Sequence, residues 1–328
     1  MPASIIKNIF FLIFSIKFGN DKYLVKTNKY GKTNKMKKII IVTGGAGFVG
    51  SNLIEHLSKE KKYNIISIDN YSSGKKKNHI KSKLVKYLKG DTRNIYNICN
   101  KYKKNISAIF HFGEFARIHQ SFFKTKECFD SNITGTQKVI NFCSENNIKL
   151  IYSATSASLG NKGEDQNLSP YAFSKTNNLK LILNMKKWFG LKYEILYFYN
   201  VYGLRQIKTG DMATVIGIFE ELYERGKALT IVKPGTQTRK FTHIDDTVNG
   251  CIEAWKKNKN REYILSNTKS YSVKDVAYMF SKKIKFVPKR LGERFKSANV
   301  SLVDGRKIYR IPCNKSLKLY IRNFKLGM

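Results

Sequence analysis

The segment KKIIIVTGGAGFVG, at residues 37–50, determines the predicted fold. Its first half is a continuous β-branched run, which is typical of a strand buried on both faces of a parallel sheet. A glycine-rich turn follows, with glycines at positions 44, 47 and 50 among others, and residues 51–59 then place apolar side chains at helical spacing. The glycines therefore lie where a strand turns directly into a helix.

Glycines at such a turn have a specific use. Without Cβ atoms they allow a tight turn and the close approach of a pyrophosphate, which the N–H groups at the helix start would face. The next predicted strand, residues 64–69, ends in Asp69, 19 residues after Gly50. An acid there accepts hydrogen bonds from a ribose 2′-OH and repels a 2′-phosphate, which favours NAD over NADP. A glycine turn in an unrelated α/β fold, and a plain turn role for Asp69, stay open.

The alternation of strands and helices continues up to residue 200. Further strands are predicted at 84–88, 108–112, 149–153 and 193–199, and helices at 126–146 and 171–187. This rhythm predicts an α/β fold with a doubly wound, Rossmann-type parallel sheet. We assign residues 36–200 to an NAD-binding domain, with 239–270 contributing. The less regular residues 201–238 and 271–328 are predicted to form a smaller C-terminal substrate-binding lobe over the carboxyl edge of the sheet.

Residues 1–35 differ in character from the remainder of the chain. The apolar run at 5–18 is interrupted by lysines, and no small-residue cleavage site comes after it. We expect a disordered leader, or upstream sequence ahead of a natural start at Met36, rather than a weak membrane-surface anchor.

The composition is that of a globular protein with an unusual charge. The 328 residues are 42% hydrophobic, which excludes disordered and collagen-like chains, and no apolar stretch is long enough to span a membrane. The formal charge of +38 suggests a nucleic-acid or membrane binder on one interpretation. We favour drift toward lysine, because only 11 of the 61 basic residues are the arginines that phosphate recognition prefers.

The cysteines and histidines predict neither a metal site nor a disulfide framework. The five cysteines are scattered, with no C-x-x-C pair, and the five histidines form no H-x-x-x-H pair. Reduced thiols fit a cytoplasmic protein.

A candidate catalytic set lies at residues 169–175, with the sequence SPYAFSK. Tyr171 and Lys175 are four residues apart and so share one helical face. A free tyrosine has a pKa of ~10, and a neighbouring ammonium together with a nicotinamide cation would lower it far enough for the phenol to act as a base. Thr155, just after the fifth strand, is placed to bridge that phenol and a substrate oxygen. The alternatives are a surface ion pair for the first two residues and a local backbone cap for Thr155.

These segments together resemble the extended short-chain dehydrogenases/reductases, in the NAD-dependent nucleotide-sugar epimerase/dehydratase family, and most resemble the UDP-glucose 4-epimerases. The resemblance covers the chain from about Met36 to the C-terminal region. It implies that Tyr171 is the base, that Lys175 lowers its pKa and holds the nicotinamide ribose, and that Thr155 orients the C4 oxygen. It also implies a homodimer packed through the helices at 126–146 and 171–187.

The resemblance assigns further residues by position. NAD contacts are implied for Gly44, Gly47, Phe48, Val49, Gly50, Asp69, Asn70, Asp91, Thr92, Phe112, Gly113, Asn132, Tyr171 and Lys175. Contacts to the nucleotide-sugar substrate are implied for Thr155, Asn200, Arg239, Arg290 and Glu293. Neither a metal, a specific nucleic acid nor a membrane span is expected.

Two positions depart from the family pattern. Glu114 follows the fourth strand, where small or amide residues are common, and it would either reshape the pocket or be a partly solvated loop acid. Ser156 and Ala157 follow Thr155, where dehydratases and decarboxylases of the family carry acids. Their absence favours simple epimerisation at C4. The alternatives are another dehydratase, a reductase or a uronate epimerase, and, less favoured, an RNA-binding protein on this scaffold.

Overall fold

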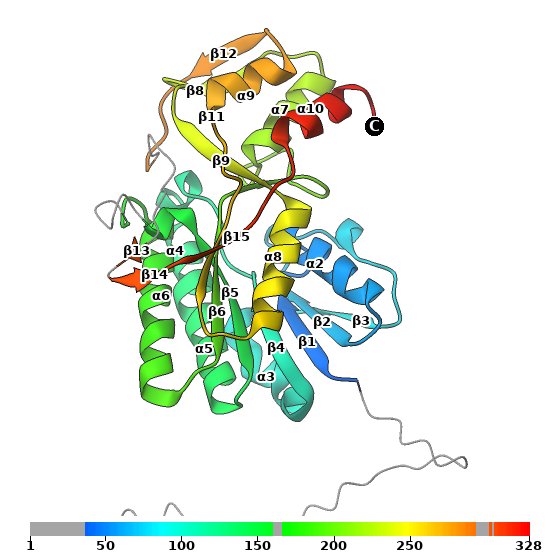
Figure 1. Ribbon diagram of the computed structural model, residues 1–328, viewed down its shortest axis with the longest axis vertical. Coiled ribbons are helices and arrows are strands. Elements are labelled where there is room, and N and C mark those ends of the chain that lie inside the picture. Colours follow the sequence, from blue (N-terminus) through cyan, green and yellow to red (C-terminus); the bar gives the residue numbers. More distant parts are fainter. Residues whose placement is uncertain (1–36, 160–165, 293–301, 304) are drawn as a thin grey trace, which may run out of the picture. The chain divides into compact units, whose positions relative to one another are not determined.

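A computed structural model describes residues 37–159, 166–292, 302–303 and 305–328. The expected leader at 1–35 therefore lies outside the described residues. The described chain folds into a parallel sheet with helices on both faces and a smaller lobe beyond the carboxyl ends of the strands (Figure 1).

The main sheet has eight strands in the order β15-β10-β6-β5-β4-β1-β2-β3, and every pairing in it is parallel. The strands are β1 (Ile39–Thr43), β2 (Asn64–Asp69), β3 (Val85–Lys89), β4 (Ile106–His111), β5 (Lys149–Thr155), β6 (Tyr193–Phe198), β10 (Glu262–Leu265) and β15 (Tyr309–Ile311). The chain moves outward from β1 to β3 and then crosses to β4 on the other side of β1. Ligands of open α/β sheets bind at such a reversal point. The predicted Rossmann-type sheet is confirmed.

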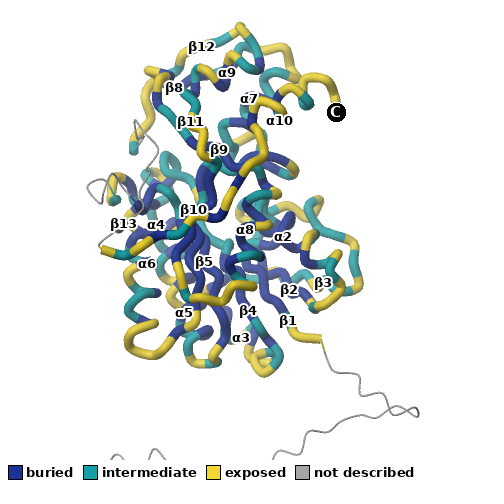
Figure 2. Tube along the Cα trace, viewed as in Figure 1, coloured by how far each residue is buried: buried dark blue, intermediate teal, exposed yellow. Residues whose placement is uncertain are grey.

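The helices cover the two faces separately. On one face lie α2 (Phe48–Lys59) and α8 (Ile244–Lys257), and on the other α3 (Ile95–Cys99), α4 (Thr125–Phe129), α5 (Thr136–Glu145) and α6 (Pro170–Phe189). In β1, Ile40 and Val42 pack in the cluster that includes α2 and α8, whereas Ile41 packs in the cluster with α3, α5 and α6. All three are fully buried, as the dark centre of Figure 2 shows. The expectation that this strand is buried on both faces is therefore confirmed.

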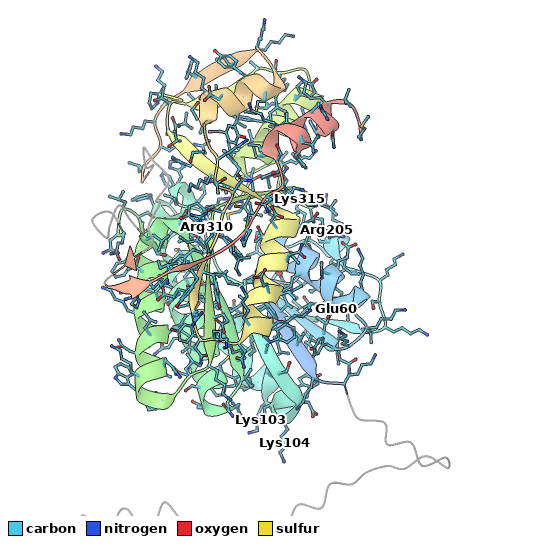
Figure 3. The ribbon with its side chains drawn as sticks, viewed as in Figure 1. Glu60, Lys103, Lys104, Arg205, Arg310 and Lys315 are labelled. Carbon is cyan, nitrogen blue, oxygen red and sulfur yellow. The ribbon has the colours of Figure 1, made fainter. Side chains whose placement is uncertain are left out.

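The smaller lobe contains two short sheets and three helices. Its elements are β7 (Asn200–Tyr202), α7 (Val215–Glu224), β8 (Leu229–Val232), β9 (Thr238–His243), β11 (Ser270–Ser272), α9 (Val273–Phe280), β12 (Ile284–Val287) and α10 (Leu317–Lys325). Arg205, in the loop after β7, ties this lobe to the start of the sheet domain (Figure 3). Its guanidinium donates to Glu55 at 2.6 Å and to Asn52 at 3.1 Å, both on α2. The lobe is thus anchored above the glycine turn that begins α2.

Two short strands, β15 and β9, belong to the other part of the fold than the one to which their segments were assigned from the sequence. β15 comes from 271–328, the stretch predicted for the lobe, yet it pairs with β10 at the edge of the main sheet. β9 begins the 239–270 stretch predicted for the sheet domain, yet it pairs with β7 and β11 in the lobe. Three-residue pairings between distant segments are fixed by tertiary contact, so the local pattern does not show them.

Two further properties concern the helices and the thiols. Within the described ranges, no helix is both long enough and apolar enough to cross a membrane. All five cysteines are buried and unpaired.

A buried ion pair between two strands of the main sheet, Lys149 of β5 and Glu194 of β6, allows the packing of the sheet to be tested. Lys149 contacts Glu194 at 2.7 Å, and their side chains are only 7% and 0% exposed. We expect Lys149→Ala to lower the free energy of unfolding by about 3 kcal/mol, because it leaves Glu194 as an uncompensated buried charge. Urea denaturation measures this loss.

The matched control is Lys257→Ala, which removes the exposed pair with Glu253 on α8. Exposed pairs contribute about 0–1 kcal/mol. Equal effects of the two substitutions would contradict the structural role of the Lys149–Glu194 pair.

Candidate active site

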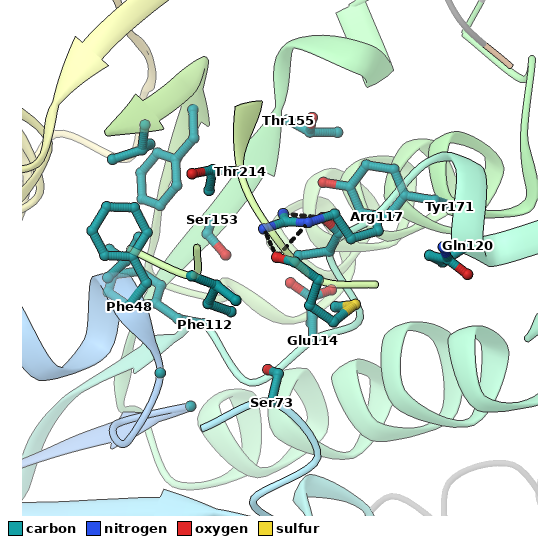
Figure 4. A pocket seen from close by; sticks show the side chains of 18 of the residues that line it. Phe48, Ser73, Phe112, Glu114, Arg117, Gln120, Ser153, Thr155, Tyr171 and Thr214 are labelled. Atoms are coloured by element: carbon teal, nitrogen blue, oxygen red, sulfur yellow. Dashed lines mark hydrogen bonds between the residues drawn. The ribbon is translucent and has the colours of Figure 1, made fainter. Parts of the chain in front are cut away.

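A cavity of about 730 Å³ opens at the carboxyl edge of the sheet, beneath the lobe (Figure 4). This volume is in the range of small-molecule sites. Most of the predicted site residues line it, namely Gly44, Gly47, Phe48, Val49, Gly50, Asp69, Asn70, Asp91, Thr92, Phe112, Gly113, Thr155, Tyr171, Lys175, Asn200, Arg239 and Arg290. Glu293 lies outside the described residues, and Asn132 lies behind the wall.

The turns after β1 and β4 meet at the bottom of the cavity. Gly44 has a φ of +69°, and a Cβ there would be 2.8 Å from backbone atoms of Phe112 and Gly113. Thr43 joins the two turns, because its Oγ1 accepts the N–H groups of Phe112 at 3.1 Å and Gly113 at 3.0 Å. A Cβ at Gly50 would be only 2.2 Å from the Gly44 carbonyl oxygen. The backbone at this turn is therefore open toward the cavity, as the approach of a pyrophosphate requires.

Asp69 lies at the end of β2, beside the glycine turn. Its carboxylate accepts the N–H of Ala46 at 2.9 Å and that of Tyr71 at 2.7 Å. Burial is the main influence on its pKa and raises it, while these N–H donors oppose the rise. The fixed carboxylate keeps further lone pairs for ribose hydroxyls. The turn and Asp69 together fit NAD.

The far end of the cofactor groove is built from Asn70, Asp91 and Thr92. The Asn70 amide donates to Asp91 at 3.1 Å, and Asp91 also binds Arg93 at 2.9 Å. Hydrogen bonds from Arg93 and Asn70 outweigh the effect of burial and lower the pKa of Asp91. Asn70, Asp91 and Arg93 are thus joined in one polar cluster beside the cavity.

Tyr171 and Lys175 come from the first turns of α6. The helix begins at Pro170, and the Ser169 side chain caps it by accepting the Ala172 N–H at 3.1 Å. Thr155, at the end of β5, lines the same cavity as the Tyr171 hydroxyl (Figure 4). Burial raises the pKa of Tyr171 to about 12, and the Thr155 side chain counteracts this rise. The predicted trio therefore meets at one wall of the cavity.

Lys175 is paired with Glu114. Its ammonium donates to Glu114 Oε2 and, at 2.6 Å, to the carbonyl oxygen of Ser153, and it lies over the ring of Tyr152. The Glu114 side chain is only 2% exposed. The expectation of a partly solvated loop acid is therefore wrong, and the pocket-shaping alternative holds.

Glu114 Oε1 ends a directed hydrogen-bond chain. Because Thr43 Oγ1 accepts two N–H groups, its own hydroxyl donates to His111 Nδ1, 2.7 Å away. His111 Nε2 then donates to Thr136 Oγ1 at 2.9 Å, and Thr136 donates to Glu114 at 3.0 Å. Burial lowers the pKa of His111 to about 4, which is consistent with this neutral tautomer. The glycine turn is thereby coupled to the catalytic wall.

Asn132 supports the site from behind. The predicted helix over 126–146 is divided, and Asn132 lies in a π-helical turn, Asp130–Gly135, between α4 and α5. Its amide pairs with both backbone groups of Phe115, at 2.6 and 3.0 Å, and also donates to Ser174 at 3.1 Å. Asn132 is fully buried and fixes the loop after β4 rather than lining the cavity.

The opposite wall carries residues from the lobe. Asn200 on β7 donates its amide to the Lys240 carbonyl at 2.9 Å, and Arg239 lies on β9. Arg290 lies after β12 and, like Arg239, lines the cavity.

Sequence reasoning did not identify Arg117, which also lines the cavity. Arg117 is one of only 11 arginines in a lysine-rich chain and follows Glu114 by three residues. That rarity, next to an acid already recognised as unusual, was the available signal.

The fold and this site define a dinucleotide-dependent α/β enzyme of the extended short-chain dehydrogenase/reductase type. The profile of the family described as "NAD dependent epimerase/dehydratase family" matches residues 40–266. The chain belongs to this family, whose members are NAD-dependent nucleotide-sugar epimerases and dehydratases.

Individual relatives show the same relationship. An uncharacterized UDP-glucose epimerase of Bacillus subtilis is 34% identical over 227 residues, which are 64% of this chain and 70% of that protein. A UDP-N-acetyl-alpha-D-glucosaminuronate decarboxylase of Bacillus cytotoxicus is 29% identical over 74% of this chain and 79% of its own. A UDP-N-acetylglucosamine 4-epimerase structure from Methanobrevibacter ruminantium, with UDP-N-acetylmuramic acid, superposes with a TM-score of 0.77, 26% identity, and coverage of 89% and 100%.

The acid at the end of β2 leads to a prediction about cofactor choice. We expect the protein to bind NAD more tightly than NADP, because the Asp69 carboxylate repels a 2′-phosphate. Asp69→Asn should weaken NAD binding about tenfold and narrow the difference between the two cofactors. Isothermal titration calorimetry with each cofactor measures both effects.

Asp211→Asn is the control, because Asp211 also lines the cavity but is half-exposed and pairs with Lys124. It should leave the preference unchanged. An unaltered preference in Asp69→Asn, with thermal unfolding showing an intact fold, would contradict the assignment of Asp69.

Proposed function

We propose that this protein is an epimerase that inverts C4 of a UDP-sugar by transient oxidation with bound NAD. The observation that carries the proposal is that Tyr171 and Thr155 line the same cavity, with no available acid beside them among the described residues. The names of the relatives support a UDP-sugar as substrate.

The acids of the cavity favour epimerisation over elimination or decarboxylation. Among the described lining residues the carboxylates are those of Asp69, Asp91, Glu114 and Asp211. The first two flank the glycine turn, Glu114 is held by Lys175, and Asp211 pairs with Lys124. Ser156 and Ala157 occupy the positions after Thr155. None of these four carboxyl groups is therefore free to protonate a leaving hydroxyl at C6.

The chain's own groups would act at the C4 hydroxyl. Thr155 orients the sugar oxygen toward the Tyr171 phenol, and the phenolate takes the hydroxyl proton. NAD, when bound, would supply the reversible hydride acceptor that inversion at C4 requires. Tyr171 then gives the proton back to the new hydroxyl. Lys175, at the same wall, is the candidate to hold the nicotinamide ribose.

The lobe would hold the diphosphate. Arg239 and Arg290 line the cavity, and a guanidinium binds phosphate oxygens in a bidentate manner. Asn200, between the two walls, would contact the same group. Held only at its nucleotide end, the keto sugar is free to turn over, which inversion at C4 requires.

The first test is product analysis by NMR with UDP-glucose, UDP-galactose, their N-acetyl forms and a UDP-uronate. Approach to a mixture of C4 epimers without net NADH would support the proposal. A released 4-keto product, net cofactor consumption or loss of carbon dioxide would instead indicate a dehydratase, a reductase or a decarboxylase.

Tyr171→Phe removes the base and keeps the ring. We expect turnover to fall by ~10²–10⁴-fold, because this is the usual contribution of proton transfer by a positioned side chain. The NAD affinity should stay within twofold of the parent value, and the unfolding temperature should stay within a few degrees of it. The control is Tyr199→Phe, another cavity-lining tyrosine, and full activity in Tyr171→Phe would overturn the assignment.

We also propose a cytoplasmic homodimer formed through α4 and α6. Phe173 on α6 is 41% exposed and packs against Phe129 of α4, with ring centroids 6.0 Å apart. Five buried free thiols suit a reducing compartment.

Phe173→Glu should convert the dimer into a monomer, because it places a charge within an apolar contact. Light scattering coupled to size-exclusion chromatography measures the mass. Tyr278→Glu on α9, where the side chain is 46% exposed, is the control. A monomeric parent protein would refute the dimer directly.

A further inference from the structure

Arg117 carries a positive charge in the cavity wall without an acid to balance it. Its guanidinium donates to the carbonyl oxygens of Met212, in the loop before α7, and of Ala116, the latter at 2.7 Å. Within the described part of the chain, no carboxylate forms an ion pair with it. Arg117 is half-buried in the cavity wall, and burial lowers its pKa. Such a cation is stabilised by an anion that forms beside it.

Tyr171 is the group beside it. Figure 4 shows Arg117 and Tyr171 projecting into the same part of the cavity, and the two interact electrostatically. Three other elements place groups near the phenol. These groups are Thr155 at the end of β5, Glu114 in the loop after β4 and the Cys128 thiol on α4. Lys175 lies on the same helix as Tyr171, one turn further on.

Lys175 is poorly placed to supply uncompensated charge. Its ammonium is paired with the Glu114 carboxylate, bonded to the Ser153 carbonyl and placed over the Tyr152 ring. The pair is neutral as a whole, and its two charges act on the phenol with opposite signs. Among the described residues, Arg117 is therefore the cation near Tyr171 whose charge no acid cancels.

We propose that Arg117 is a positioning residue that stabilises the Tyr171 phenolate by its charge, while Glu114 neutralises Lys175. The inference rests on the proposed function in taking Tyr171 as the base. The two residues act as a compensating pair: the acid that cancels one cation is accompanied, three positions later, by another cation. The uncompensated positive charge that acts on the phenol therefore comes from the loop after β4 rather than from α6.

This division of charge predicts opposite effects for the two residues. Removal of the acid in Glu114→Gln should lower the pKa of Tyr171, because the carboxylate raises it now. Removal of the cation in Arg117→Gln should raise that pKa, because the guanidinium lowers it now. We expect each shift to be on the order of one pH unit, as is common when a charge near a titratable group is removed. The double variant should return close to the parent.

The experiment titrates the tyrosinate absorbance of the full-length protein, with and without NAD and without any sugar. Each spectrum is read against a matching variant that also carries Tyr171→Phe, because the chain has 19 tyrosines. The difference between Glu114→Gln and the double variant gives the effect of Arg117 on the pKa of Tyr171. This comparison falls in a lower pH range, because Glu114→Gln lowers that pKa. Circular dichroism confirms that each protein stays folded over the titration.

Arg117→Lys separates charge from structure, because lysine keeps the positive charge but cannot reproduce the fork on Met212 and Ala116. We expect its titration to stay near the parent, whereas a role confined to tying the Met212 loop would make it behave like Arg117→Gln. If neither Arg117 variant moves the titration, or if both move it equally, the proposal is overturned. Should Glu114→Gln not fold, the two Arg117 variants alone decide the question.

The pH–rate profile provides the second readout once a substrate is known. The midpoint of the limb that rises with pH should shift to lower pH in Glu114→Gln and to higher pH in Arg117→Gln, because turnover needs the phenolate. The spectroscopic titration needs no sugar, so its result on Arg117 remains valid even if the protein does not epimerise a sugar at C4. Conversely, active variants with unmoved titrations would reject only the role of Arg117.

Discussion

The buried Glu114 carboxylate must be surrounded by donors, because a charge removed from water is stable only when it is paired and hydrogen-bonded. Its Oε2 receives Lys175, and its Oε1 receives the hydroxyls of Thr136 and Tyr152 and the amide of Asn178. These partners come from α6, α5 and β5, so one carboxylate fixes the spacing of three elements around the site. The position of α6 therefore depends on this one acid.

The same network reaches the cofactor turn. From Thr136 it continues through neutral His111 to Thr43, whose Oγ1 holds the backbone of Gly113. The close approach of the turns after β1 and β4 is possible only because glycine occupies both sides of the contact. One hydrogen-bonded chain thus connects the glycine turn, where a dinucleotide would bind, with the wall that carries Lys175 and Tyr171.

Much of this protein could be predicted from local pattern. Six strands of the main sheet, the glycine turn and the start of α6 agree with periodicity, glycine spacing and a capped proline, all of which act within a few residues. For Glu114 the prediction left two alternatives, an acid that shapes the pocket and a partly solvated one, and only the tertiary structure shows the side chain to be buried. The prediction missed Arg117, the break in the helix at Asn132 and the pairing of β15. Each of these depends on partners far away along the chain, which no local pattern reveals.

The sequence by itself determined the fold class and the identity of the reactive groups, because strand, turn and helix chemistry is written in neighbouring residues. Only the tertiary structure decided how the charges are distributed among those groups. Coulomb interactions and burial depend on distance through space, so Glu114, Lys175 and Arg117 acquire their relationship to Tyr171 only when β4, β5 and α6 are packed together. Residues that are merely acidic or basic in the chain become a balanced electrostatic environment in the folded protein.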